Sequence, residues 1–281
     1  MAVRSVPRGV NMATQSFREL EQAGWNRKAA QYDDYFARIT SQAIEPILDT
    51  LDVKKGLVLL DVCCGTGALT HAAARRGCVA TGIDFAAEMV AQASRNYPGL
   101  AFREGDATAV DFEDASFDVV ACSFGILHLD EPERAIDEAL RVLRPGGRYG
   151  FTAWSSTGDF FELVMTAIKT FGRLDVALPP APPISRFADP AECRRVLEQS
   201  GFTEVASKEL PLIWRCQSPE DILALTYKSL VRIPMLLEAQ TTADRDRIHR
   251  AILDGAKRYK TGSEIELRCP ALLVTATKPQ G

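Results

Sequence analysis

A glycine turn directly follows the first strongly apolar run of the sequence, residues 57–62. Asp61 lies in that run, and the turn contains Gly65, Thr66 and Gly67. Glycine lets the backbone approach a ligand closely, and a helix that starts after such a turn presents free N–H groups and a partial positive charge. A plain turn between a strand and a helix would have a similar sequence, so the turn alone does not establish a binding site.

Two more aspartates close the next two apolar runs. The carboxylate of Asp84 could accept hydrogen bonds from both hydroxyls of a ribose. Asp106 could accept a hydrogen bond from an exocyclic amine, while the backbone N–H of Ala107 could meet a ring nitrogen. Each aspartate alone could instead cap a helix or stabilise a turn. Acids at three successive strand ends around one glycine turn predict a nucleoside-containing cofactor.

Four segments of the chain resemble successive motifs of the class I S-adenosylmethionine-dependent methyltransferases. They read L-L-D-V-C-C-G-T-G, T-G-I-D-F, E-G-D-A and L-R-P-G-G-R-Y. The resemblance covers residues 57–154 and is greatest to the branch with the menaquinone and ubiquinone C-methyltransferases. It extends less closely to W-N-R-K-A-A-Q-Y near the N-terminus and to residues 187–202. It implies S-adenosyl-L-methionine as the cofactor.

The resemblance also implies contacts between this cofactor and particular residues. Asp61 would meet its amino group, and Asp84 would hold its ribose. The other residues would line the cofactor: Gly65, Thr66 and Gly67 along the methionine part, Ser123 near the methyl group, Phe85 against the adenine, and Asp106 and Ala107 at the adenine edge. The family usually has glycine where this chain has Cys63, so the loop must tolerate a side chain there. That thiol could be reactive, or it could be a packed small residue.

His128 and the N-terminal aromatic residues are the candidates for the methyl acceptor side. His128 follows the fourth apolar run, where a neutral imidazole could take a proton from an attacking hydroxyl or could only position the loop. Trp25, Tyr32 and Tyr35 could close over the cofactor as a flap, because an aromatic face suits a sulfonium cation. Alternatively, they belong to a helix that packs on the sheet edge.

The elements that must position these residues alternate between short apolar runs and helical segments. This alternation predicts βαβ units and a doubly wound, mostly parallel α/β sheet, whose active-site loops gather at the carboxyl ends of the strands. The resemblance implies the seven-stranded, Rossmann-like methyltransferase version of this fold. We expect strands at 57–62, 78–83, 101–106, 117–124 and 148–154, and further extended segments at 202–205, 210–216, 264–267 and 272–277.

The chain divides into four expected regions: an N-terminal extension and helical flap at 1–50, the cofactor-binding core at 51–217, a helical insertion at 218–261, and a final core strand and tail at 262–281. The insertion carries Leu223, Tyr227 and Leu230 at helical spacing. We expect it to act as a lid on which these three residues line an acceptor pocket together with His128. A homodimer surface or extra core is the alternative.

Composition restricts the partners. The chain has 33 basic and 37 acidic residues and a net charge of −4, which argues against a nucleic-acid partner. No apolar run reaches the ~20 residues needed to span a bilayer. The 7 cysteines and 3 histidines lack disulfide-framework or zinc-ligand spacing, so we expect a cytoplasmic protein without a metal site.

These features predict a methyltransferase that moves a methyl group to an O, N or C atom of a small-molecule acceptor by in-line displacement. Two alternatives share part of the pattern. A catalytically silent regulatory or partner protein could keep every cofactor residue. An NAD(P)-dependent dehydrogenase would share the glycine turn, but its third glycine would fall at Thr70, and it gives no role to Asp61 or Asp106.

Overall fold

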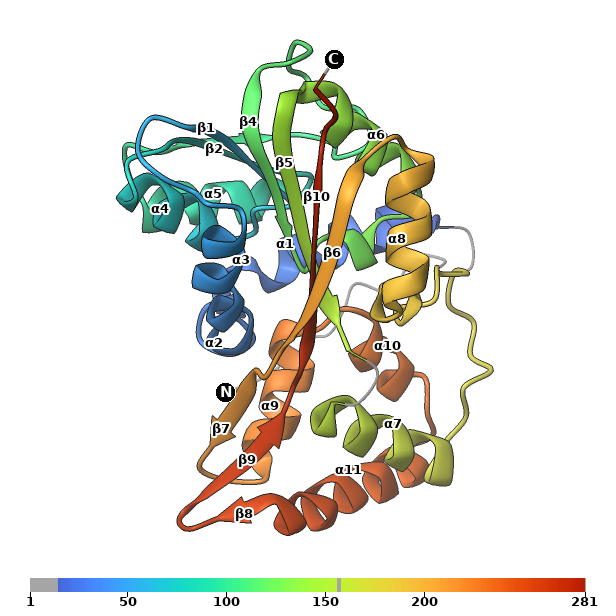
Figure 1. Cartoon of the computed structure of the whole chain (residues 1–281). Coiled ribbons are helices and arrows are strands. Elements are labelled where there is room, and N and C mark those ends of the chain that lie inside the picture. The colour runs from blue at the N-terminus through green and yellow to red at the C-terminus, as the bar shows by residue number, and fades with distance from the viewer. Residues whose placement is uncertain (1–14, 156–157, 281) are drawn as a thin grey trace.

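The computed structural model describes residues 15–155 and 158–280, and its centre is a seven-stranded sheet (Figure 1). The strand order is β3-β2-β1-β4-β5-β10-β6. Strands β1 to β5 pair in parallel, whereas β10 is antiparallel to both of its neighbours. The predicted seven-stranded, mostly parallel α/β fold is therefore confirmed. The strands span Val58–Val62 (β1), Val79–Asp84 (β2), Ala101–Glu104 (β3), Phe117–Ser123 (β4), Leu143–Trp154 (β5), Thr203–Leu210 (β6) and Ala271–Thr277 (β10).

The central strands are apolar because helices cover both faces of the sheet. Leu59 and Leu60 of β1 and Val119 and Val120 of β4 are all fully buried. Two-sided burial explains why these strands are continuous apolar runs rather than alternating ones. The covering helices are α3 (Ile44–Thr50), α4 (Ala68–Arg75), α5 (Ala87–Asn96), α6 (Pro132–Val142) and α8 (Pro190–Gln199).

Helix α1, Phe17–Tyr32, lies across the carboxyl ends of the strands rather than against the sheet (Figure 1). Ser16 and Glu19 form a capping box that starts it. A short helix α2 (Ala37–Thr40) and a 3-10 turn (Ser41–Ala43) lead from α1 into α3. From residue 15 onward, the N-terminal region is thus a series of helical segments that bend around the end of the sheet (Figure 1).

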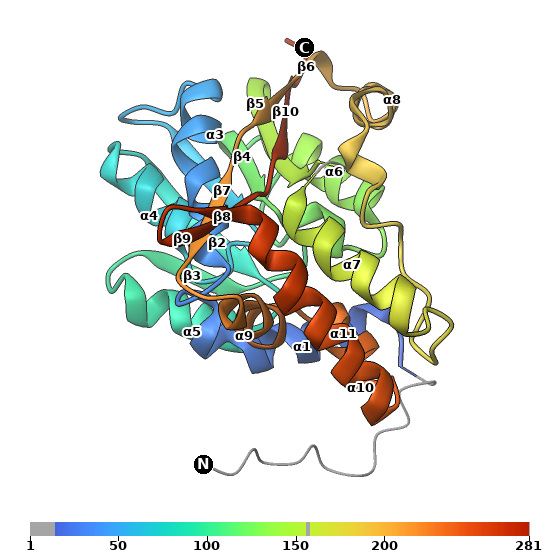
Figure 2. The ribbon, with the colours of Figure 1, turned by 90° about the horizontal axis from the view of Figure 1, so that it is seen from below.

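A second, smaller unit lies beyond the carboxyl ends of β5 and β6 (Figures 1 and 2). Its three-stranded antiparallel sheet has the order β7-β9-β8. The unit contains β7 (Ile213–Cys216), α9 (Glu220–Ser229), α10 (Arg232–Glu238), α11 (Thr242–Ala256), a 3-10 turn (Lys257–Tyr259), β8 (Lys260–Thr261) and β9 (Glu264–Arg268), and α7 (Asp159–Phe171) packs on α11. The helices fall within the expected 218–261, but strand pairing brings residues on both sides into the same unit. Of the last two strands, only β10 belongs to the main sheet.

The loops after β1 and β4 meet in unusually close packing. Cys63 has a φ of 58°, a left-handed conformation that disfavours a side chain. A Cβ atom at Gly125 would lie 2.3 Å from the Cβ of Cys63 and 2.8 Å from the Sγ of Cys122. Hydrogen bonding with Cys122 and burial raise the pKa of the Cys63 thiol well above its usual range. Cys63 therefore packs as a small residue, and Gly125 provides its space.

We predict that Gly125→Ala lowers the free energy of unfolding by about 1–3 kcal/mol, because the new methyl group overlaps two side chains. Adding Cys63→Gly should restore part of this loss, since it removes the closest contact. Gly158→Ala is the matched control, because its new Cβ would meet nothing nearer than 3.6 Å. Urea unfolding gives the free energy of unfolding of the wild type, the Gly125→Ala and Gly158→Ala variants and the double variant. Wild-type stability of Gly125→Ala would show that the loops do not pack as described.

Candidate functional site

Two adjoining pockets open at the carboxyl ends of the parallel strands, with about 450 and 580 Å³ of open space. The first is lined by the end of β1, the glycine turn and the α2–α3 region, and the second by the ends of β2, β4 and β5 and by α1. They share Tyr32, Cys63, Gly65 and Ser123. A molecule in one pocket would therefore touch a molecule in the other.

Asp61 is a buried carboxylate with one unused oxygen in the first pocket. Its side chain is 1% exposed. The backbone N–H (3.0 Å) and the hydroxyl (2.7 Å) of Thr70 donate to Oδ2, whereas Oδ1 is buried without a partner among the described residues. Burial raises the pKa of Asp61 to about 7, although the hydrogen bonds from Thr70 lower it. Because an unpaired buried carboxylate oxygen is costly, Oδ1 fits a ligand that brings a donor, such as an ammonium group.

The glycine turn shapes the floor of the first pocket. Gly65 and Gly67 have φ values of 53° and 90°, which glycine adopts without strain. Gly65 and Thr66 line the pocket, and the Thr66 hydroxyl donates to Asp33. Gly67 is the N-cap residue of α4 and does not line either pocket. The turn therefore presents backbone at Gly65 and Thr66.

Asp84 ties the end of β2 to the glycine turn. Its side chain is 5% exposed and lines the second pocket. The backbone N–H groups of Ala86 and Gly65 donate to Oδ1 and Oδ2, each over 2.9 Å. Burial raises the pKa of Asp84 to about 6, against these hydrogen bonds. Phe85 lines the pocket directly after it.

Asp106 and Ala107 lie outside both pockets, beneath α1. Arg18 holds the Asp106 carboxylate in an ion pair with contacts of 3.2 and 2.7 Å. Burial raises the pKa of Asp106, but hydrogen bonds from Thr108 and Arg18 outweigh burial and leave that pKa below its usual range. Sequence reasoning did not anticipate Arg18, since it lies 88 positions away.

Ser123 stands where the two pockets join. It is the last residue of β4, and its hydroxyl lies 3.4 Å from that of Thr152 on β5. Thr152 in turn accepts a hydrogen bond from the backbone N–H of Phe124.

Aromatic side chains form the walls of the second pocket. Phe124 and Trp154 stack with ring centroids 4.2 Å apart, and Phe36 meets Trp154 edge-on at 5.3 Å. Trp25 and Tyr32 of α1 complete the wall. Sequence reasoning missed Phe36, Phe124 and Trp154; the positions of the last two at the ends of neighbouring strands were the available signal. Such a lining suits a flat, apolar molecule.

His128 lines the same pocket and belongs to a buried polar network. Its Nδ1 lies 2.9 Å from Oε2 of Glu21, which also accepts a hydrogen bond from the Trp25 indole N–H over 3.0 Å. Glu21 is 1% exposed and was not among the predicted site residues. Of the N-terminal aromatic residues, Trp25 and Tyr32 line the pocket and Tyr35 does not. Helix α1 thus covers the pocket from outside.

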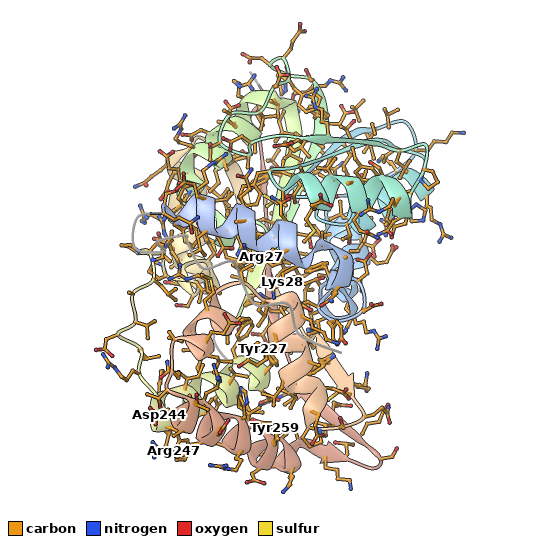
Figure 3. The ribbon with its side chains drawn as sticks, turned by 180° about the vertical axis from the view of Figure 1, so that it is seen from behind. Arg27, Lys28, Tyr227, Asp244, Arg247 and Tyr259 are labelled. Atoms are coloured by element: carbon orange, nitrogen blue, oxygen red, sulfur yellow. The ribbon has the colours of Figure 1, made fainter. Side chains whose placement is uncertain are left out.

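The structure does not bring Leu223, Tyr227 and Leu230 to either pocket, which corrects the expectation that they line the acceptor cavity. The physical reason is that α1, which carries Trp25 and Tyr32 of the second pocket, lies between the main sheet and α9 (Figure 3). Tyr227 bonds instead to the Nε2 of His249 over 2.8 Å, and its backbone carbonyl accepts a hydrogen bond from Lys28 of α1. The insertion therefore contacts the helix that covers the site, not the site itself.

Residues 15–155 and 158–280 contain no group of three or more His, Cys, Asp or Glu side chains arranged to hold a metal ion. Within the same two stretches, no helix is both long and apolar enough to cross a membrane.

Comparisons with known proteins agree with this geometry. A family model described as a methyltransferase domain matches residues 60–151. The demethylmenaquinone methyltransferase of Paenarthrobacter aurescens is 30% identical over 190 residues, which cover 62% of this chain and 75% of the relative. The 2-phytyl-1,4-naphtoquinone methyltransferase of Thermosynechococcus vestitus is 32% identical over 189 residues, which cover 59% of this chain and 80% of the relative.

A solved structure shows the same fold. The Haemonchus contortus phosphoethanolamine N-methyltransferase 2 in complex with S-adenosyl-L-methionine is 18% identical, with a TM-score of 0.56, and the match covers 98% of this chain and 62% of that one. None of these findings favours a dehydrogenase or a silent binding protein. The chain belongs to the class I S-adenosylmethionine-dependent methyltransferases that act on small molecules, near the menaquinone C-methyltransferase branch.

Proposed function

We propose that this methyltransferase acts on a flat aromatic acceptor with an ionisable ring hydroxyl, such as a hydroquinone, held against the aromatic wall of the second pocket, beside the part that Asp84 and Phe85 line. The observation that carries this proposal is the aromatic wall formed by Phe36, Phe124 and Trp154. It lines the second pocket, which adjoins the first pocket that contains Asp61. The quinone-type names of the two relatives support the same acceptor class.

The described residues fit the cofactor's chemistry at several points. Asp61 offers its unpaired Oδ1 to the amino group, and Gly65 and Thr66 line the space for the methionine part. Asp84 and Phe85 would hold the ribose and the adenine. Asp106, Ala107 and Gly67 line neither pocket, so any contact of theirs with the cofactor would be at its edge. Bound there, S-adenosylmethionine supplies an electrophilic methyl group on a sulfonium centre, and Ser123 lies where the two pockets meet.

The protein's part in the reaction is to align the acceptor and exclude water. Burial raises the pKa of Tyr32 to about 12, so its phenol stays neutral between the two pockets. In this proposal the imidazole of His128, which lines the second pocket, takes the proton of the acceptor hydroxyl. The aromatic walls would exclude water from the acceptor and hold its nucleophilic atom beside the methyl group of the bound cofactor.

We further propose that, of the region 1–50, whose first 14 residues lie outside the described part, α1 acts as the flap, and that the insertion supports this flap instead of lining the pocket. Lys28 donates to the backbone of Tyr227, and a Cβ atom at Gly24 would lie 2.3 Å from Val231, so the two units are in tight contact. In this proposal the insertion affects the pocket only through its contacts with α1. Unpaired cysteines throughout the described residues support a reducing, cytoplasmic location.

Cofactor affinity should fall at acid pH. Burial raises the pKa of Asp61 to about 7 in the free protein, so below that pH its carboxyl group carries a proton. The ammonium group of the ligand favours the ionised carboxylate, so binding at low pH must first remove this proton. We expect S-adenosylhomocysteine affinity to be flat just above pH 7 and to fall as the pH drops from about 7 to 5.5. The slope should approach about tenfold per pH unit, and then exceed it as Asp84 also titrates. Calorimetry measures this, with Asp61→Asn expected to bind less tightly and to lose the dependence near pH 7. A flat wild-type profile would contradict this role for Asp61.

The acceptor pocket can be tested with Trp154→Leu. Loss of the stacked indole should weaken acceptor binding by about 1–2 kcal/mol and so raise the KM for 1,4-dihydroxynaphthalene roughly 5- to 30-fold. S-adenosylhomocysteine affinity should stay within about twofold. Trp214→Leu is the matched control, because Trp214 is equally buried but lies in β7, away from both pockets. Equal effects of the two substitutions on KM would place the acceptor elsewhere.

A further inference from the structure

Glu21 is a buried acid that the proposed reaction does not yet use. It lies on the inner side of α1, and its Oε2 receives the indole N–H of Trp25. An indole nitrogen can only donate, so this oxygen acts as an acceptor. The same oxygen lies 2.9 Å from Nδ1 of His128, which comes from the loop after β4.

This contact selects one form of the imidazole ring. An ionised carboxylate has no proton to donate, so the proton of the neutral ring must be on Nδ1. Nε2 is then the nitrogen with a free lone pair, on a ring that lines the aromatic pocket. The indole of Trp25 meets the ring edge-on, with centroids 4.9 Å apart at 85°, and so limits its rotation.

The docking of α1 brings Glu21 to His128. Arg18 pairs with Asp106, and Gln22 donates to the backbone carbonyl of Phe85, so both sides of Glu21 are tied to strand ends. Glu21 and His128 are 107 positions apart, and only this packing brings them together. A carboxylate that is 1% exposed and shared by two donors is held in one position.

We infer that Glu21 is a positioning residue: it holds His128 with Nε2 facing the acceptor and stabilises the imidazolium that forms there. The inference rests on the proposed function. The O–H bond of the acceptor breaks, its electron pair stays on the acceptor, and the proton moves to Nε2. The carboxylate then faces a doubly protonated ring, and the ion pair favours that state.

Other charged groups also face this pair. The Asp84 carboxyl at the end of β2 is close enough that a charge on His128 lowers the pKa of Asp84. Arg232 of α10 also faces the pair: burial lowers its pKa, and the negative charge of Glu21 offsets only part of this effect. Because these charges also act on the pair, a direct view of the His128 ring is a sharper test than a pH profile of turnover.

The first test is the ¹⁵N spectrum of the His128 imidazole in the intact wild-type protein, assigned with His128→Ala. The inference requires the Nδ1–H form when the ring is neutral. It is overturned if the neutral ring carries its proton on Nε2. This readout needs no acceptor, so it stands even if the proposed reaction fails.

The second test is Glu21→Gln, assayed with 1,4-dihydroxynaphthalene. The amide keeps the shape but removes the charge and can donate to Nδ1, so kcat should fall about 10- to 100-fold. S-adenosylhomocysteine affinity should stay within about twofold. Glu113→Gln is the matched control: it makes the same change at an exposed acid that lines neither pocket, and it should leave kcat unchanged.

A double variant separates positioning from a general structural effect. Glu21→Gln should cause no further loss of kcat in a His128→Ala background, because the two residues act as a unit. An equal loss in both backgrounds would overturn the inference. If wild-type protein does not methylate the naphthohydroquinone, the proposed acceptor class fails, and the spectrum still decides the role of Glu21.

Discussion

The site depends on carboxylates that the sheet buries at its own carboxyl edge. Parallel strands end at the same edge, so β1 and β2 bury Asp61 and Asp84 at one end of the sheet, with Asp61 opposite Gly82 and Asp84 two residues further on. Burial raises the pKa of both, to about 7 and about 6. Backbone donors offset this cost for Asp84, whereas Oδ1 of Asp61 has no partner among the described residues. In the proposed function, the amino group of a ligand would donate to this oxygen.

Helix α1 links this edge to the rest of the molecule. Its inner side meets Asp106, the backbone of Phe85 and His128. Its outer side meets the insertion, through Lys28 and the close packing of Gly24 on Val231. The family's cofactor edge is thus covered by one helix, and the second unit holds that helix in place. In the proposed function, changes in the insertion would therefore act on the acceptor through α1, without contact between the insertion and the acceptor.

The sequence predicts the sheet well because local patterns encode it, and it also names several of the residues that line the two pockets. Apolar runs that end at Asp61 and Asp84 mark buried strands, and the motif spacing identifies the turn between them. The acceptor side depends on contacts between distant segments, such as Glu21 with His128, which no local pattern reports. The lid residues were misplaced for the same reason: helical spacing shows that Tyr227 has a buried side but not that α1 lies in between. Likewise, β9 pairs with β7 rather than with the main sheet.

The central claim is that the carboxylates at the strand ends hold S-adenosylmethionine. Calorimetric titration of S-adenosylhomocysteine into wild-type protein and Asp84→Ala tests it most directly. Loss of a carboxylate bound to two hydroxyls costs about 2–3 kcal/mol, so affinity should fall roughly 30- to 150-fold while the fold stays intact. Asp130→Ala, an exposed acid just after the pocket loop, should bind like the wild type, and NAD should not bind to any of the three proteins. Unchanged affinity in Asp84→Ala would contradict the account.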